Sequence, residues 1–414
     1  MAFVKSTASV IILHFRKNIT EAVDLAATAC YTDCTIGMRG DYVMLKRFEV
    51  KNFKGFKNNL VLDLTAREYG FNRTVVKEGL VNKAIIYGKN GVGKSNLGIA
   101  IFDIILHLTD KERIPYHYLP YYLNLESDSP FATFRYVFQF DDDEVIYEYE
   151  KRNADHLLSE KLYFNQKLVV DYHYFETTRK FVDKDLAGDL RIELIDNKLS
   201  VLKYIYRNTP ANPDSLLTKL LQFCENMLWY RSLSDGNAYC GFSNGVATLT
   251  EKLYENGKIR EFEQFLAEND LHYRLRFVRK NDGHELMAVY KNNDETREAP
   301  FVNLASTGTM VLFLFFIWKA SAFNKISFLF IDEFDAFLHY ESAETLVLQL
   351  NKAKMFQSIL TTHNTYLMQN KLTRPDCCYI MTDNKITSLY NCTEKEIREA
   401  HNLEKMYING AFNG

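Results

Sequence analysis

Residues that interrupt regular structure are scarce in this sequence, which has 18 glycines and 7 prolines among 414 residues. Because disordered linkers are usually rich in such residues, the composition does not predict long linkers. An excess of charge is also missing, since the formal net charge is −3. The balance argues against a generally cationic nucleic-acid binder, although a local basic patch remains compatible with it.

Paired cysteines and long apolar runs are missing as well. The seven cysteines stand at positions 30, 34, 224, 240, 377, 378 and 392 and form no pair of CxxC steps and no Cys/His cluster. This pattern argues against a zinc site and suits the reducing cytoplasm, where we expect the protein. The apolar run at residues 8–15 is too short to span a bilayer, and no other segment is long enough.

Residues 1–43 are expected to form an extension that precedes the folded domain. A faint similarity of LAATAC at residues 25–30 to a lipoprotein cleavage site is weakened by the polar segment NITEAVD, which lies where an apolar core should be. We therefore expect a soluble protein with no contact to a membrane.

The periodicity of apolar residues predicts an α/β protein. Alternation predicts two strands within residues 44–64, β-rich segments at 131–152 and 157–175 with a polar turn at 141–144, and strands near 273–279 and 285–291. Helical spacing prevails from 214 to 271, where one apolar face is expected to include Met227 and Leu228. The predicted parts are therefore 44–179, a mainly helical insertion at 180–271, and 272–414.

The strongest motif is GKNGVGKS at residues 88–95, which matches G-x-x-x-x-G-K-[ST] at every fixed position. A buried strand, AIIY, precedes it and an apolar helical pattern follows it. Glycines let backbone N–H groups approach phosphates closely, and the helix directs its positive end at them. Lys94 is expected to neutralise the β- and γ-phosphates of a nucleoside triphosphate, and Ser95 to bind Mg²⁺.

Two further apolar strands end in polar residues. ISFLFIDE ends in Asp332, expected to hold Mg²⁺, and Glu333, expected to orient and deprotonate the attacking water. QSILTTH delivers His363 to the same end of the sheet, where it can sense the γ-phosphate. Upstream, LASTGT opens an apolar helix, and Ser306 and Gly308 at its start are expected to bind the phosphate held by a second subunit.

The order of these motifs resembles that of the ABC-type ATPases related to the SMC and RecF proteins, and more narrowly the compact bacterial ATPases of the AAA15 type. The resemblance covers residues 44 to about 412, and the run FEVKNFKGF…AIIYGKNGVGKSNL is most similar to the ATPase subunit of the PARIS anti-phage system. It implies a P-loop NTPase fold of ABC type, with a mixed sheet core, a β-rich lobe and a helical insertion.

The resemblance also implies residue roles. Nucleotide binding is assigned to Gly88, Lys89, Asn90, Gly91, Val92, Gly93, Lys94, Ser95, Asn96, Lys54, Ser306, Gly308 and Asp335, metal binding to Ser95, Asp332 and Gln139, and catalysis to Glu333 and His363. The motif at 306–309 has one glycine and no glutamine, unlike the transporter form LSGGQ. That departure leaves the strength of ATP-driven dimerisation open.

The expected function is an Mg²⁺-dependent ATPase that forms a head-to-tail dimer with composite ATP sites. The sequence has no long coiled-coil arm and no room for a fused nuclease after residue 412, so the resemblance implies a separate toprim-type nuclease effector and a phage-encoded trigger. Two alternatives remain: a RecF-like repair ATPase that clamps DNA, and a scaffold that binds ATP without hydrolysing it.

Two surfaces are candidates for partners. The aromatic stretch at residues 229–239, within the predicted insertion, is expected to contact the effector or trigger. Arg274 and Arg276 alternate with apolar residues and so share one strand face, which suits either a nucleic-acid backbone or an ordinary solvated sheet.

Overall fold

The computed structural model describes residues 43–111, 121–176, 180–192, 196–232, 239–241, 249–281, 283–292, 295–383 and 385–412. The predicted extension at residues 1–43 lies outside this range except for Val43, which begins the first described strand. No helix in these residues is long and apolar enough to cross a membrane.

The central sheet has seven strands in the order β12-β11-β16-β17-β5-β18-β19. Its parallel strands are β11 (Met227–Arg231), β16 (Phe328–Asp332), β17 (Gln357–Thr362), β5 (Lys83–Tyr87) and β18 (Cys378–Thr382), and the edges are the antiparallel β12 (Tyr239–Gly241) and β19 (Lys385–Ser388). Every residue of β5, β16 and β17 is buried. Such continuous burial is typical of parallel strands that are covered on both faces.

Alternate side chains of these strands enter two different hydrophobic cores. On β16, Phe328 and Phe330 pack in the core that includes α2 (Lys94–Phe102), whereas Leu329 and Ile331 pack in the core that includes α11 (Thr307–Ser321) and α12 (Tyr340–Lys352). Because successive side chains of a strand point to opposite faces of the sheet, they enter the two cores alternately.

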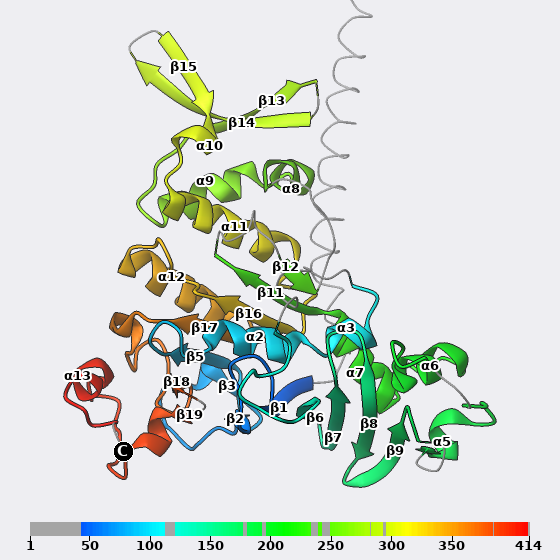
Figure 1. The fold of residues 1–414 in the computed structure, drawn as a ribbon. Helices are drawn as coiled ribbons and strands as arrows, with labels where there is room; N and C mark the ends of the chain where they lie inside the picture. The colour runs from blue at the N-terminus through cyan, green and yellow to red at the C-terminus, as the bar shows by residue number, and fades with distance from the viewer. Residues whose placement is uncertain are drawn as a thin grey trace, which may run out of the picture. The chain divides into compact units, whose positions relative to one another are not determined.

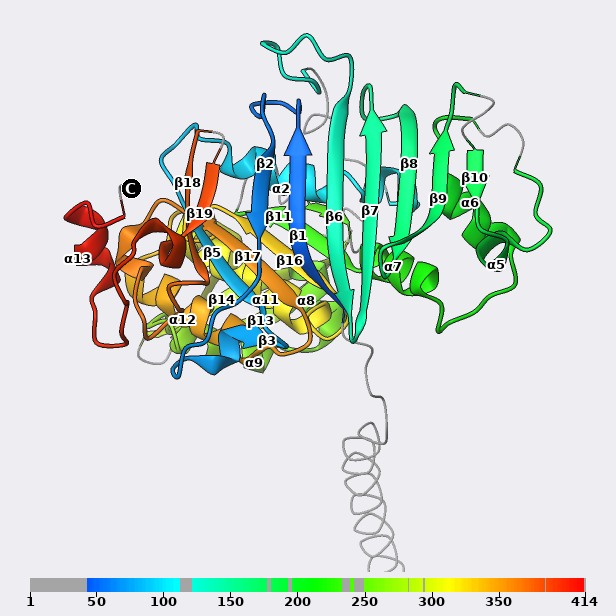
Figure 2. The ribbon, with the colours of Figure 1, turned by 90° about the horizontal axis from the view of Figure 1, so that it is seen from below.

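A second sheet of seven strands is antiparallel throughout, in the order β10-β9-β8-β7-β6-β1-β2 (Figure 2). Its strands are β1 (Val43–Lys51), β2 (Leu60–Asp63), β6 (Ala132–Phe140), β7 (Asp143–Lys151), β8 (Leu157–Phe164), β9 (Lys167–His173) and β10 (Lys180–Val182). Tyr136 on β6 donates hydrogen bonds to the carbonyls of Ala100 and Ile101, so this sheet packs on α2. It is the predicted β-rich lobe, with the polar turn at 141–142 between β6 and β7.

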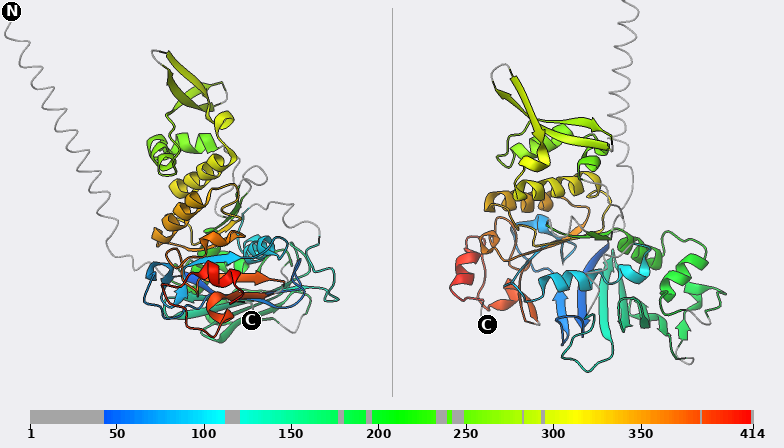
Figure 3. Two further views of the ribbon diagram at one scale, coloured as in Figure 1. Left: turned by 90° about the vertical axis from the view of Figure 1, so that its left-hand side faces the viewer. Right: turned by 45° about the horizontal axis from the view of Figure 1, so that its top comes forward.

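The remaining elements flank these sheets. A three-stranded sheet of β13 (Leu275–Lys280), β14 (Gly283–Asn292) and β15 (Glu295–Pro300) lies beyond α8 (Leu249–Asn256) and α9 (Ile259–Ala267), on the side of α11 away from the central sheet (Figures 1 and 3). The other elements are η2 (Arg73–Val75), β3 (Val76–Lys77), β4 (Leu80–Val81), α3 (Ile105–Leu108), α5 (Lys184–Ala187), α6 (Val201–Asn208), α7 (Leu216–Glu225), α10 (Phe301–Leu304), η3 (Thr365–Leu367), η4 (Leu389–Cys392) and α13 (Leu403–Ile408).

The range predicted as one helical insertion, 180–271, is divided in the structure. α7 ends at Glu225, and Met227 and Leu228 begin β11, which pairs with β16 in the central sheet. The expectation that these two residues continue a helical face is therefore wrong. A short apolar run does not distinguish a buried strand from a buried helix by periodicity alone.

Candidate nucleotide-binding site

The loop between β5 and α2 has the geometry that phosphate binding requires. Gly91 and Gly93 have positive φ angles of 85° and 101°, a conformation that side chains with a Cβ rarely adopt. Gly93 precedes the first residue of α2, so the loop leads directly into the helix N-terminus. The backbone N–H groups of that first turn have no acceptor within the helix, which favours an anion there.

Lys94 lies inside this loop. Its Nζ donates hydrogen bonds to the carbonyl oxygens of Gly88 at 2.7 Å and Lys89 at 3.0 Å, and the residue is 5% exposed. Burial lowers the pKa of Lys94, and the carboxylates of Asp332, Glu333 and Asp335 oppose this shift. The loop and the acidic end of β16 are thus close enough to interact electrostatically.

Asp332 at the end of β16 is fully buried, and its carboxylate oxygens are suited to binding a metal ion. Its Oδ1 accepts a hydrogen bond from the Thr361 hydroxyl at 2.7 Å, while its Oδ2 has no hydrogen-bond partner among the described residues. Burial raises the pKa of Asp332, and hydrogen bonds from Ser95 and Thr361 lower it. A hydroxyl and a buried carboxylate oxygen that lie together fit Mg²⁺, which prefers oxygen ligands.

Glu333 follows Asp332 and has a left-handed backbone conformation with φ of 49°. Its N–H donates to Thr361 Oγ1 at 2.8 Å, so Thr361 contacts both acidic residues. Its carboxylate accepts hydrogen bonds from Arg231, at the end of the neighbouring strand β11. Sequence analysis did not identify Thr361 or Arg231 as site residues, because the role of each depends on strands that are adjacent only in the fold.

Asp335 and His363 are brought together. Burial raises the pKa of the Asp335 carboxyl, whereas hydrogen bonds from Thr362 and Asn364 and the nearby His363 lower it. His363 itself is exposed at the end of β17. The loop after β16 and the loop after β17 therefore form one edge of the site, as expected for neighbouring parallel strands.

The start of α11 contacts the loop after β16 of the same chain. Ser306 is exposed and caps the helix, since its Oγ accepts the N–H of Thr309 at 3.1 Å. A Cβ on Gly308 would lie 2.6 Å from the carbonyl oxygen of Phe337, so only glycine permits this close approach. Within its own chain, Gly308 thus lies against Phe337.

Lys54 and Gln139 were both expected near the phosphates, and the structure separates them. The loop that carries Lys54 lies against the phosphate loop, because Gly55 contacts the Asn96 side chain and Phe56 contacts Gly93. The expectation for Gln139 is wrong. It pairs with Met44 at the start of β1, whereas the Lys54 loop follows the other end of that strand, about 20 Å away at ~3.3 Å per residue.

The aromatic stretch differs from expectation, whereas the arginine pair fits one of the two interpretations that the sequence left open. Trp229 and Tyr230 are each 3% exposed in β11, so they cannot form the expected aromatic contact surface, and residues 233–238 lie outside the described residues. Arg276 makes two hydrogen bonds to the carboxylate of Glu298 on β15, at 2.6 and 2.5 Å. This pairing favours the solvated-sheet interpretation over contact with a nucleic-acid backbone.

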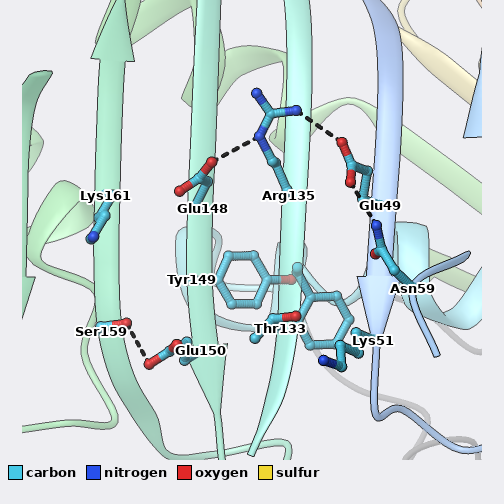
Figure 4. A pocket seen from close by; sticks show the side chains of 11 residues that line it. Glu49, Lys51, Asn59, Thr133, Arg135, Glu148, Tyr149, Glu150, Ser159 and Lys161 are labelled. Carbon is cyan, nitrogen blue, oxygen red and sulfur yellow. Dashed lines mark hydrogen bonds and ion pairs between the residues drawn. The ribbon is translucent and has the colours of Figure 1, made fainter. Parts of the chain in front are cut away.

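A cavity of about 440 Å³ lies on the antiparallel sheet (Figure 4). Arg135 on β6 bridges Glu49 on β1 and Glu148 on β7 at 2.9 and 2.8 Å, and Asn59 also donates to Glu49. Cross-strand pairs of this kind stabilise a solvated sheet face.

Together, the phosphate loop between β5 and α2, the acidic end of β16 and the histidine after β17 are the elements of a P-loop ATPase with a mixed α/β fold. The family model described as "AAA domain, putative AbiEii toxin, Type IV TA system" matches residues 83–369. The chain belongs to this family. No curated protein matches the chain.

Among solved structures, the chain is similar to heads of SMC proteins. An SMC head bound to the C-winged helix domain of ScpA has 16% identity and a TM-score of 0.41, with 84% of this chain and 97% of that chain covered. The SMC head domain from Thermotoga maritima has 16% identity and a TM-score of 0.39, with 83% and 98% covered. An SMC head with an extended coiled coil, bound to the C-terminal domain of ScpA from Pyrococcus furiosus, has 16% identity and a TM-score of 0.42, with 84% and 96% covered.

Proposed function

We propose that this protein hydrolyses ATP and uses the nucleotide to control its assembly and a separate effector. The observation that carries the proposal is the convergence of Lys94, Ser95, Asp332 and Glu333 at one edge of the central sheet. A phosphate loop alone supports nucleotide binding. The second carboxylate, Glu333, supports hydrolysis because it can act on a water molecule while Asp332 serves the metal.

In this proposal Mg²⁺, held by Ser95 and Asp332, would neutralise charge on the phosphates. Lys94 binds the β- and γ-phosphates, and the N-terminus of α2 adds backbone donors. Glu333 orients the attacking water and accepts its proton. His363 holds the water from the adjacent loop, and Lys54 adds positive charge from the loop after β1.

A second copy of the chain is proposed to complete the site. Ser306 is exposed at the N-terminus of α11, where it can reach a nucleotide bound by another subunit. Near it, the loop after Asp335 exposes Phe337, which is 66% accessible, and Tyr340 and Tyr366 are exposed with ring centroids 6.3 Å apart. Exposed aromatic side chains beside a nucleotide site support a surface that becomes buried when two copies associate.

The effector is proposed to be a toprim-type nuclease that the ATPase restrains until a phage-encoded trigger arrives. The support is the motif resemblance to anti-phage ATPases, together with the family, which is described as an "AAA domain, putative AbiEii toxin, Type IV TA system". The resemblance and the family description both favour control of a toxic response over a role in metabolism.

The central experiment compares the wild-type protein with Glu333→Gln. We expect the variant to bind ATP as the wild type does, to hydrolyse it on the order of 10²- to 10⁴-fold more slowly, and to accumulate as a dimer with ATP and Mg²⁺. Turnover and light scattering measure these properties. Unchanged hydrolysis in Glu333→Gln would contradict the proposed chemistry, and a monomer at every nucleotide concentration would contradict the assembly.

The alternatives give different results. A RecF-like DNA clamp predicts strong stimulation of hydrolysis by duplex DNA, which the pairing of Arg276 with Glu298 disfavours. A scaffold that only binds ATP predicts that Glu333→Gln keeps its cellular function. Co-expression with a toprim nuclease tests control of the effector directly, through nuclease toxicity with and without the ATPase.

A further inference from the structure

Arg231 ends β11 and lies beside Asp332, which ends β16, and Glu333, which follows it. The two strands are parallel, with Arg231 in register with Asp332. Its Nε and Nη2 donate to Oε2 of Glu333 at 3.2 and 2.7 Å, and its Nε lies 3.6 Å from Oδ2 of Asp332. Burial is the main cause of the lowered pKa of Lys94, and the nearby positive charge of Arg231 adds to the shift, so this charge acts within the site.

The two hydrogen bonds restrict the Glu333 side chain in a specific way. Both donors go to Oε2, and among the described residues none goes to Oε1. When hydrogen bonds hold one oxygen of a carboxylate, the other oxygen stays available to accept a proton. Its direction is fixed by the oxygen that is held. A general base that is oriented by a third group is a recurring arrangement in enzymes.

The Glu333 backbone is fixed at the same place. Its left-handed φ of 49° is uncommon for a residue with a side chain, and its N–H is bound by Thr361. Thr361 therefore fixes the main chain and Arg231 fixes the carboxylate. With both ends held, few orientations remain for the base.

We propose that Arg231 is the positioning residue for ATP hydrolysis, acting through Glu333 by binding one carboxylate oxygen and directing the other at the attacking water. This inference rests on the proposed function. The side chains of Arg231 and Glu333 are 34% and 31% exposed. Ion pairs that are partly open to solvent add little to stability, so loss of the pair should alter the rate rather than the fold.

The test uses Arg231→Gln, which keeps a polar side chain of similar reach but removes the guanidinium. We expect kcat for ATP to fall about 10- to 100-fold, as small misplacements of a catalytic group can cost ~10²-fold. The KM for ATP should stay within about threefold of the wild-type value. The affinity for ATP, measured by calorimetry, should stay within about threefold of that of Glu333→Gln, which serves as the reference. Arg276→Gln is the matched control, because it also removes two arginine hydrogen bonds to a glutamate, Glu298, but in the three-stranded sheet, and it should leave kcat unchanged.

A double variant separates positioning from a structural role. If Arg231 acts through Glu333, Arg231→Gln in the Glu333→Gln background should lower the residual rate by less than about twofold. Arg231→Lys, which retains one charged donor, should recover part of the lost kcat. The inference is overturned if Arg231→Gln leaves kcat unchanged or raises it, if it lowers ATP affinity in parallel, or if the two substitutions are additive. By contrast, an unaffected rate in Glu333→Gln alone would refute the proposed function itself.

Discussion

Thr361 donates its hydroxyl proton to Oδ1 of Asp332 at 2.7 Å and, with the same oxygen, accepts the N–H of Glu333 at 2.8 Å. One hydroxyl on β17 thus fixes both acidic residues that end β16. Thr361 is fully buried, so no water can replace the hydroxyl without entering the core.

Replacement of Thr361 by valine keeps the shape and removes the hydroxyl. We expect the free energy of unfolding to fall by about 1–3 kcal/mol, because Asp332 and the Glu333 N–H lose their partner in a buried place, and turnover of ATP to fall about tenfold. Urea unfolding and a steady-state ATPase assay measure the two effects. Thr361→Ser is the control and should stay close to the wild type; equal losses in both variants would show that the methyl group matters instead.

Lys94 should determine nucleotide affinity. Lys94→Ala removes the amino group that donates to the carbonyls of Gly88 and Lys89. We expect ATP to bind about 10- to 100-fold more weakly, since a hydrogen bond to a charged group contributes ~1.5–3 kcal/mol. Isothermal titration calorimetry provides the measurement. Lys89→Ala, which changes an exposed lysine of the same loop, should bind ATP nearly as the wild type does; an equal loss there would mean that charge alone, not position, sets the affinity.

Gly308 should be required for the contact between α11 and the loop after β16. In Gly308→Ala the new Cβ would lie 2.6 Å from the Phe337 carbonyl oxygen, so the backbone must shift. We expect a loss of about 1–3 kcal/mol in unfolding free energy, measured by denaturant unfolding, with ATP affinity unchanged. Gly70→Ala is the control, because no atom lies within 4 Å of the added Cβ. A loss of ATP affinity in Gly308→Ala would contradict a purely structural role and would favour contact of Gly308 with the nucleotide held by a second subunit.

His107 should make stability depend on pH. The residue is buried with its Nε2 2.9 Å from the Tyr147 hydroxyl. Burial, with smaller contributions from Lys151 and Lys203, lowers the pKa of His107 well below the usual 6.5. The unfolded chain binds a proton below about pH 6.5 while the folded chain does not, so acid favours unfolding.

Between pH 7.5 and 5.5, this residue alone should lower the free energy of unfolding by about 1.4 kcal/mol. Urea unfolding at both pH values measures the change. His107→Gln retains a donor for Tyr147 but does not titrate, so its loss should be smaller by that amount. If the two proteins lose stability equally, His107 is protonated in the fold.

The sequence was sufficient for the local parts of the site. GKNGVGKS specifies its own loop, because glycines at fixed spacing and a following helix need no distant residue to form the turn. Apolar runs that end in DE and TTH likewise predicted buried strands with polar ends, and β16 and β17 have this form.

The prediction failed where one-dimensional patterns are ambiguous. MLWYR continued an apparent helical stripe, so a strand of the central sheet was missed, and with it Arg231. Gln139 was assigned to the metal by resemblance, but antiparallel pairing of β1 with β6 places it opposite Met44, at the end of β1 away from the Lys54 loop. Strand order and register depend on contacts between distant residues, which no local pattern specifies.

The sequence by itself determined that this protein has a phosphate loop, an acidic strand end and a histidine after a neighbouring strand, because each is encoded within a few consecutive residues. Only the tertiary structure decided which side chains hold these groups. Arg231 and Thr361 meet Glu333 because parallel pairing sets β11 and β17 on either side of β16. Because parallel strands run in the same direction, their carboxyl ends lie at one edge of the sheet, and segments that are distant in the sequence form one site there.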